Sequence, residues 1–258
     1  MQAIKEEIII TFRDKEEQPL FYVESGSRLW EIESPDSDYD VRGFHLQSKQ
    51  QYFDFKKQQD IITVMNGDFD FVSYDVDKMF GLLAKSNPMV LEWIRSHIVY
   101  MNKLPSWKNF QQDILANINF SALFFHYLSL ARGHIKIMET NKKFTYKNLF
   151  YCIRGLLSAD LAAKQILPEL SIGSLFCQCD ENEELVKIAQ ESLLEKRKKK
   201  EKTEVAQQDQ EKILTIIKSF IRKIENMPPS QNKHKKNNLT NILTEYSLCL
   251  KEKYYHKA

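Results

Sequence analysis

The spacing of hydrophobic residues changes from period two to period 3.6 partway along the chain. Before residue 75, short apolar stretches alternate with polar positions and are divided by turn residues, which is typical of β-strands. An amphipathic helix is predicted over 2–16, followed by strands at PLFYVES (19–25), YDVRGFHL (39–46), DIITVM (60–65) and DFDFVSY (68–74). Asn66-Gly67, between the last two strands, predicts a tight hairpin turn.

Beyond residue 75 the apolar patterns are helical. Helices are predicted over 76–83 and from Pro88, then over 106–117, 119–139, 145–164, 181–204, 206–226 and 238–255. The polar stretch MPPSQNKHKKNN (227–238) is predicted to be a linker or loop. The predicted fold class is therefore α+β. A small mixed β-sheet domain over 1–104 precedes an all-α domain over 105–258 with a basic C-terminal region.

Composition narrows the class of protein. A hydrophobic share of 43% and an aromatic share of 12% are enough for a packed core. The 7 glycines and the absence of GxxxxGK[ST] and GxGxxG argue against P-loop and glycine-rich dinucleotide folds. No apolar run approaches the ~18–20 residues of a membrane helix, and the acidic start does not resemble a secretory signal. We expect a cytoplasmic protein with no membrane partner and no disulfides.

The formal net charge of +2 conceals a split along the chain. Residues 1–130 hold 13 Lys+Arg and 19 Asp+Glu, whereas residues 131–258 hold 24 and 16, so the two halves carry −6 and +8. The densest basic block is Lys196–Lys202, and a second cluster runs from Lys233 to Lys236. Each is either a solvated helix segment or a contact to the phosphate backbone of RNA, without interleaved aromatics for base stacking.

Candidate chemistry concentrates in ESGSRLWEIESPDSDYDVRGF (24–44). Gly26 lets the backbone come close to a ligand, and Ser27 offers a hydroxyl and an N–H to a phosphate at the start of a short helix. Asp38 and Asp40 stand two apart on an extended segment, so their side chains point to the same face. Two such carboxylates repel unless a cation lies between them, and Mg²⁺ suits carboxylate oxygens together with substrate phosphates.

A third carboxylate is expected on a neighbouring strand. Asp70 is preferred, because its aromatic neighbours would face the core while the acid faces the site. Asp75 and Asp68 remain alternatives, although Asp75 is also a natural cap for the helix that follows and Asp68 is also a turn residue.

Basic and aromatic residues supply candidate contacts to a nucleotide. Arg28 and Arg42 either steady phosphate charge or neutralise the nearby acids. Lys147, Tyr151 and Arg154 are spaced i, i+4, i+7 and share one helix face. They either hold a triphosphate and stack on its base or form a surface stripe beside a Leu-rich core.

Together these residues resemble the nucleotidyltransferases of the DNA polymerase β superfamily, with Gly26-Ser27, Asp38-x-Asp40 and a later strand acid. The finer motifs resemble the RNA-ligase-associated (RlaP-like) predicted nucleotidyltransferases: GSRLW, SPDSDYDVRGF, KSNPMVLEWIRSHIVY (85–100), HYLSLARGH (126–134) and YKNLFYCIRGLLSA (146–159). The resemblance covers about residues 20–165 and leaves 180–258 outside its motifs. That family usually has Gly where this chain has Glu31, and Pro where it has Gly155.

The resemblance implies a two-metal nucleotidyltransferase that binds Mg²⁺ or Mn²⁺ and transfers an NMP from ATP or another NTP to an acceptor hydroxyl, releasing pyrophosphate. An RNA 3′ end is one candidate acceptor. The implied metal ligands and catalytic residues are Asp38, Asp40 and Asp70; the implied nucleotide-binding residues are Gly26, Ser27, Arg28, Arg42, Lys147, Tyr151 and Arg154. Two alternatives are nucleotidylation of a protein or tRNA and a non-catalytic, nucleic-acid-binding relic.

Overall fold

The chain folds into two compact units that interleave along the sequence. The computed structural model describes residues 1–140, 143–200, 203–227 and 233–255, without the side chains of Asp180 and of residues 233–237. The sheet unit comprises residues 1–26, 38–118 and 232–258, and the helical unit comprises 27–37 and 119–231. The division into domains at 104/105 remains a prediction.

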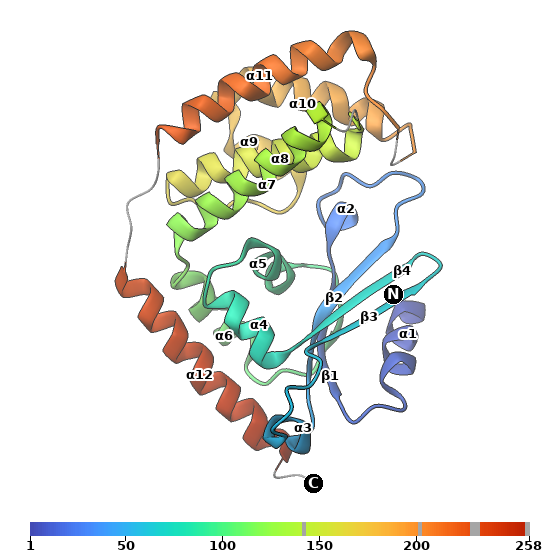
Figure 1. Ribbon diagram of the computed structural model, residues 1–258, viewed down its shortest axis with the longest axis vertical. Coiled ribbons are helices and arrows are strands. Elements are labelled where there is room, and N and C mark those ends of the chain that lie inside the picture. Colours follow the sequence, from blue (N-terminus) through green and yellow to red (C-terminus); the bar gives the residue numbers. More distant parts are fainter. Residues whose placement is uncertain (141–142, 201–202, 228–232, 256–258) are drawn as a thin grey trace. The chain divides into compact units, whose positions relative to one another are not determined.

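The sheet unit is built on a five-stranded mixed sheet in the order β3-β4-β2-β1-β5 (Figure 1). Its strands are β1 (Gln18–Glu24), β2 (Tyr39–Leu46), β3 (Ile61–Asn66), β4 (Phe69–Asp75) and β5 (Val99–Asn102). β2 and β4 are parallel, and the other neighbours are antiparallel. The predicted small mixed sheet is confirmed, and so is the hairpin at Asn66-Gly67, which joins β3 to β4.

Helices cover both faces of this sheet. On one face, Ile4, Ile8 and Phe12 of α1 (Gln2–Phe12) pack in one core cluster with residues such as Tyr22 and Phe71. The other face is covered by α4 (Val76–Leu83) and α5 (Pro88–Arg95). There Phe44 of β2 meets Phe80 of α4, and Tyr74 of β4 meets Trp93 of α5. Strand alternation therefore sends Asp40, Arg42 and Phe44 to the α4 face.

The end of the chain returns to the sheet unit as a helix. α12 (Lys233–Tyr255) packs on α6 (Trp107–Ala116) and α4. Tyr246 of α12 stacks on Phe110 of α6 with ring centroids 3.6 Å apart, and its hydroxyl donates to the carbonyl of Pro105 at 2.6 Å. Further along α12, Lys251 pairs with Asp77 at 2.7 Å. A short helix, α3 (Lys49–Phe53), completes this unit.

The helical unit is organised around α8. Its helices are α7 (Phe120–Thr140), α8 (Tyr146–Ala163), α9 (Ile172–Gln178), α10 (Glu183–Lys196) and α11 (Gln207–Glu225), with α2 (Gly26–Leu29) at the start of its first segment. α8 contacts α7, α9, α10 and α11. A Cβ on Gly155 would lie 3.0 Å from the carbonyl of Tyr127, so this glycine allows α7 and α8 to pack closely.

Several element predictions were wrong or incomplete. β5 was not predicted, because four residues with the burial pattern exposed–buried–buried–exposed show no period of two. α9 was missed, and α10 ends at Lys196 rather than 204, within a run of like charges that repel one another. α12 begins at Lys233, inside the predicted linker, whereas 228–232 lie outside the described residues.

The structure also bears on two general expectations. In the part of the chain that the structure describes, no single helix is long and apolar enough to cross a membrane, although α6 and α7 pass that test when taken together. The four cysteines are free thiols.

Candidate active site

Asp40 and Asp70 lie directly opposite each other on neighbouring parallel strands. β2 and β4 pair with Asp40 in register with Asp70. One nitrogen of Arg42, Nη2, donates to Asp40 Oδ1 and to Asp70 Oδ2, each at 2.7 Å. The side chains of the two acids are about one quarter exposed. The structure therefore brings together two of the three predicted carboxylates around a single cationic group.

Arg42 reaches both acids because it stands two residues after Asp40 on the same face of β2. Its other terminal nitrogen donates to the main-chain carbonyl of Asp70. In this state Arg42 neutralises the acids, which was one of its two predicted roles; a contact to phosphate remains a prediction. Carboxylate oxygens that converge on a cation are also the donor type that Mg²⁺ and Mn²⁺ prefer, so the pair fits a divalent ion.

Asp38, the remaining predicted metal ligand, does not form a metal cluster with Asp40 and Asp70. Asp38 comes immediately before β2, outside the strand. Among the described residues, no group of three or more His, Cys, Asp or Glu side chains is placed to hold one metal ion. The role of Asp38 therefore remains a prediction.

The two alternative acids have other functions in the structure. The Asp75 carboxylate caps α4 by accepting from the Asp77 N–H at 2.9 Å, and it also accepts from the Tyr52 hydroxyl. Burial raises the pKa of Asp75 above its usual value. The carbonyl of Asp68 accepts from the Tyr39 N–H at 2.7 Å, next to the hairpin turn. Of the three candidates, Asp70 is the one whose carboxylate shares a partner with Asp40.

Gly26 allows the backbone to pass against Asp40. Its φ of +62° lies in the left-handed region, and a Cβ built there would lie 2.0 Å from Asp40 Oδ2. The preceding Ser25 N–H donates to the Asp40 carbonyl at 2.9 Å. Any side chain at position 26 would therefore displace the Asp40 carboxylate.

Glu24 is a site residue that the sequence analysis missed. It is 1% exposed, and its carboxylate accepts from the Asp40 N–H at 3.0 Å and from the Tyr100 hydroxyl. Ser96 Oγ donates to its carbonyl at 2.8 Å. A signal was present, since an acid that ends an apolar strand is costly to bury unless it is hydrogen-bonded. Glu24 thus holds the start of the Asp40 strand in place.

In the helical unit, Tyr151 and Arg154 of α8 meet at Trp30, in the segment 27–37. The Arg154 guanidinium lies 3.7 Å from the centroid of the Trp30 ring, and Tyr151 makes an edge-on contact with that ring at 5.0 Å. Arg154 is 6% exposed, so it does not belong to a surface stripe. Lys147 lies on α8 and is half-buried.

The remaining predicted nucleotide contacts lie in the same segment. Arg28 Nη2 donates to the Ser37 carbonyl at 2.7 Å and so closes the 27–37 segment on itself. Ser27, which follows Gly26 in α2, is 6% exposed. Glu31 has a φ of +59°. Glycine, the residue that the resemblance leads one to expect here, would carry no steric penalty in that region.

The basic block begins with a buried lysine. Lys196 is 2% exposed, and its ammonium donates to the carbonyl of Ile32 and to Ser34 Oγ, the latter at 3.0 Å. Arg197 donates to the carbonyl of Glu31 at 3.2 Å. The first residues of this block therefore secure the 27–37 segment. Glu201 and Lys202, and the side chains of Lys233–Lys236, lie outside the described residues.

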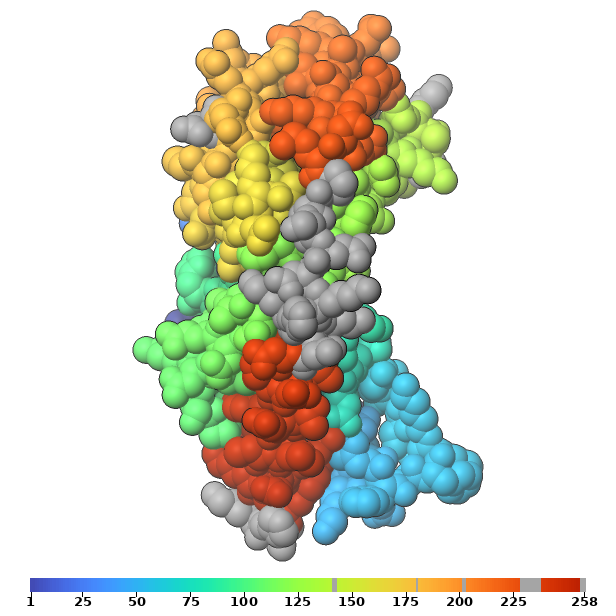
Figure 2. Space-filling view, turned by 90° about the vertical axis from the view of Figure 1, so that its left-hand side faces the viewer, coloured from blue at the N-terminus to red at the C-terminus, as the bar shows by residue number. Residues whose placement is uncertain are grey.

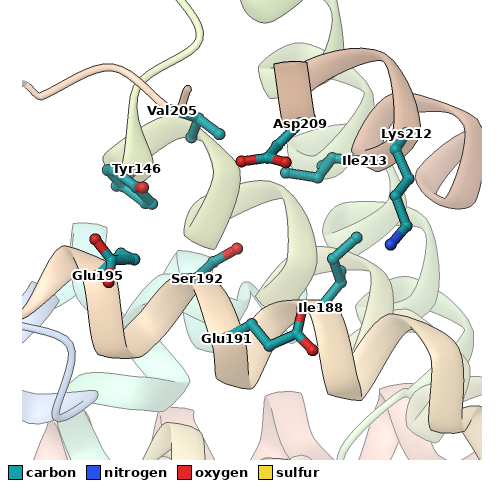
Figure 3. A pocket seen from close by; sticks show the side chains of 9 residues that line it. All are labelled: Tyr146, Ile188, Glu191, Ser192, Glu195, Val205, Asp209, Lys212 and Ile213. Atoms are coloured by element: carbon teal, nitrogen blue, oxygen red, sulfur yellow. The ribbon is translucent and has the colours of Figure 1, made fainter. Parts of the chain in front are cut away.

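A pocket of about 140 Å³ lies in the helical unit, between α8, α10 and α11 (Figure 3). Its lining carries the carboxylates of Glu191, Glu195 and Asp209 and the ammonium of Lys212. Glu195 already pairs with Lys199 at 3.3 Å. None of the predicted site residues lines this pocket, and an excess of carboxylates repels a triphosphate. It therefore does not suit a nucleotide.

A small mixed sheet with paired strand carboxylates beside a left-handed glycine, together with a helical region, is the arrangement that the motifs predicted for a protein of the DNA polymerase β type. The chain belongs to the RlaP family, the RNA repair pathway DNA polymerase beta family, whose model matches residues 2–244. The resemblance predicted from the motifs is confirmed. The match also takes in most of the residues beyond 180, which those motifs did not cover.

Two curated proteins are similar to the chain. The uncharacterized protein YcgL of Bacillus subtilis (strain 168) is 30% identical over 204 residues, 78% of this chain and 76% of YcgL. The uncharacterized protein MJ0002 of Methanocaldococcus jannaschii is 31% identical over 144 residues, 54% of this chain and 58% of MJ0002. The solved structure of a nucleotidyltransferase-like protein from Exiguobacterium sibiricum 255-15 aligns with a TM-score of 0.35 and 10% identity, covering 88% of this chain and 74% of that one.

Proposed function

We propose that this protein is a metal-dependent nucleotidyltransferase that moves an NMP from an NTP to an RNA 3′ hydroxyl and releases pyrophosphate. The observation that carries the proposal is the register of Asp40 with Asp70, whose carboxylates converge on one cationic group beside Gly26. Membership of an RNA repair family supports RNA as the acceptor.

In this proposal Asp38, Asp40 and Asp70 hold the divalent cation. Mg²⁺ or Mn²⁺, when bound, supplies charge neutralisation at the triphosphate and lowers the pKa of the acceptor hydroxyl. Asp70 accepts the proton of that hydroxyl as its oxygen forms a bond to the α-phosphorus. The bond from the α-phosphorus to the oxygen that bridges it to the β-phosphate breaks, and pyrophosphate leaves with that electron pair.

The other predicted residues bind the NTP. The backbone at Gly26 and Ser27 offers N–H groups to phosphate oxygens, and Arg28 and Arg42 supply positive charge. Lys147, Tyr151 and Arg154 of α8 remain predicted contacts to the triphosphate or the base. Arg42 now pairs with both carboxylates, so it competes with a divalent ion for them.

The test is transfer of label from each α-labelled NTP, with Mg²⁺ or Mn²⁺, into total RNA or total protein. The wild-type chain is expected to label RNA. Asp40→Asn and Asp70→Asn are each expected to lower the rate by at least ~100-fold, since each removes charge that offsets the cation and phosphates. Asp68→Asn, which changes a neighbouring acid of the turn, is the matched control and should retain activity.

Each other outcome has a meaning. Label in protein would replace RNA as the acceptor and favour a regulatory or toxin-type activity. No label with any NTP would favour a non-catalytic relic. Unchanged rates in Asp40→Asn and Asp70→Asn would reject these residues as the catalytic pair.

A further inference from the structure

Two phenylalanines at the end of α3 are exposed to solvent. Phe53 is 79% exposed and Phe55 is 91% exposed. Isolated apolar side chains are common on protein surfaces, but two large aromatic rings two residues apart are informative when both are this exposed. The residues between β2 and β3 therefore present an aromatic surface.

The segment that carries these rings is held by its own polar contacts. Ser48 and Gln51 form a reciprocal capping box at the start of α3. Beyond the helix, the Asp54 carboxylate accepts from the Lys56 N–H at 3.0 Å and from Gln58 Nε2 at 2.8 Å. These bonds fix the turn on either side of Phe55, so the rings are presented by a built structure.

Lysines surround the aromatic surface. Lys49, Lys56 and Lys57 are exposed, and the Lys56 ammonium lies 5.7 Å from the centroid of the Phe55 ring. Of the nearby acids, Asp54 is engaged in the turn, and Asp60 pairs with Lys78 at 3.2 Å and more loosely with Lys57 at 3.9 Å. Rings that stack on bases, beside cations that meet phosphates, are the combination that binds single-stranded nucleic acid. A second copy of the chain would bring like charges together.

Strand β3 runs from the aromatic surface toward the Asp70 carboxylate. β3 is an edge strand of the sheet, and the residues around 50–65 project from the sheet unit in light blue in Figure 2. Ile62 and Val64 pack toward the α1 core, so Thr63 and Met65 point to the opposite face. Both are exposed, and Met65 pairs in register with Asp70. From Ile61 to Met65 the strand spans roughly 14 Å.

We propose that Phe53, Phe55 and the lysines beside them bind the single-stranded RNA acceptor and direct its 3′ end along β3 to Asp70. The bases stack on the two rings, and the lysines meet the phosphates. This proposal rests on the proposed function for its choice of RNA and for the direction of the strand. Binding itself does not require transfer, so it is measured separately.

The experiment measures binding of a fluorescently labelled, unstructured RNA oligonucleotide to the full chain by anisotropy. Phe53→Ala/Phe55→Ala is expected to weaken binding by roughly tenfold or more, since each stacked base contributes strongly to affinity. The matched control is Phe125→Ala/Leu130→Ala, which removes two side chains of α7 that are 54% and 50% exposed. Because all four side chains are exposed, both variants should fold and melt as the wild type does.

The possible results separate the two proposals. Asp40→Asn should lose transfer yet bind RNA as tightly as the wild type. Equal RNA affinity in Phe53→Ala/Phe55→Ala and the wild type would overturn the proposal that the aromatic surface binds RNA, even if transfer is intact. The proposal would also be overturned if the wild-type protein bound no RNA. The same holds if the wild-type protein bound only vesicles with anionic headgroups and the double variant lost that binding.

Discussion

Gly26 and Gly67 share a left-handed backbone but differ in what a side chain would meet. Their φ values are +62° and +56°. A Cβ at Gly26 would lie 2.0 Å from Asp40 Oδ2, far inside van der Waals contact, whereas a Cβ at Gly67 would meet nothing within 4 Å. A comparison of substitutions at these two glycines therefore distinguishes the effect of backbone strain from the effect of damage to the candidate site.

Gly67→Ala is expected to lower the free energy of unfolding by about 1–2 kcal/mol, the cost of an L side chain in this region, and Gly26→Ala by at least as much, because its Cβ also meets the Asp40 carboxylate. Only Gly26→Ala should also abolish nucleotidyl transfer, because it pushes the Asp40 carboxylate away from Asp70. Urea unfolding and the labelled-NTP assay measure the two effects. If both variants lost transfer equally, strain alone would account for the role of Gly26.

Some site residues could be predicted from the sequence, and others could not. Asp40 and Asp70 were identified because alternation in two strands places each on a known face, and pairing of those strands then brings them together. Glu24 was not identified, because its role depends on Tyr100 and Ser96, which are distant in the sequence and become neighbours only through the β1–β5 pairing.

At the scale of elements, one buried polar network joins β1, β2 and β4. Ser73 Oγ lies 2.7 Å from the Tyr22 hydroxyl and 2.7 Å from His45 Nδ1. His45 is fully buried, and within the described residues its Nε2 has no hydrogen-bond partner. Burial lowers the pKa of His45 to about 4. The native sheet therefore holds this imidazole neutral.

This network predicts a loss of stability in mild acid. Below pH ~6.5 the unfolded chain takes up a proton at His45, whereas the native chain takes it up only near pH 4. The contribution of His45 is therefore complete above pH ~6.5 and is lost as the pH falls toward 4, by about 2 kcal/mol at pH 5. His45→Asn should make the free energy of unfolding less dependent on pH between 7 and 5. An unchanged dependence would assign the effect to other groups.

A second interaction between elements is the contact between the end of α10 and the 27–37 segment. Lys196→Met leaves the carbonyl of Ile32 and the hydroxyl of Ser34 without this donor and should lower the free energy of unfolding by about 2 kcal/mol. Because that segment carries Ser27 and Arg28, the KM for NTP should rise more than kcat falls. Hydrogen exchange of residues 27–37 should quicken.

The control for this prediction comes from the same basic block. Lys198→Met removes an ammonium whose side chain is 71% exposed, so stability should change by no more than ~0.5 kcal/mol. Equal behaviour of the two variants would show that Lys196 does not position the segment.

Elements were predictable where one pattern ran long enough. β2 was located to the residue, and α7, α8 and α11 to within one residue at each end, because each offers several turns or alternations. β5 and α9 are stabilised by their neighbours rather than by their own pattern, since four or seven residues carry too few positions to show a period. Stabilisation by residues that are distant in the sequence cannot be predicted from the local pattern of a single sequence.

At the scale of the whole molecule, charge averages do not indicate which residues meet a polyanion. The back half of the chain carries +8, yet Lys196 is buried against the 27–37 segment and Lys198 and Lys199 both pair with Glu195. The front half carries −6, yet its exposed lysines surround two exposed rings. The location of each lysine and its existing ion pairs therefore indicate where a polyanion binds better than the summed charge of either half does.

The salt dependence of RNA binding tests this distinction. The logarithm of the binding constant falls linearly with the logarithm of salt concentration, by roughly 0.7 for each phosphate neutralised on a single strand. Lys56→Gln/Lys57→Gln should therefore lower the magnitude of that slope by at most about 1.4, since Lys57 lies 3.9 Å from the Asp60 carboxylate. Lys198→Gln/Lys199→Gln should change it less, because both ammonium groups already lie beside the single carboxylate of Glu195. The reverse order would place the RNA on the helical unit, and the +8 of the back half would then reflect binding after all.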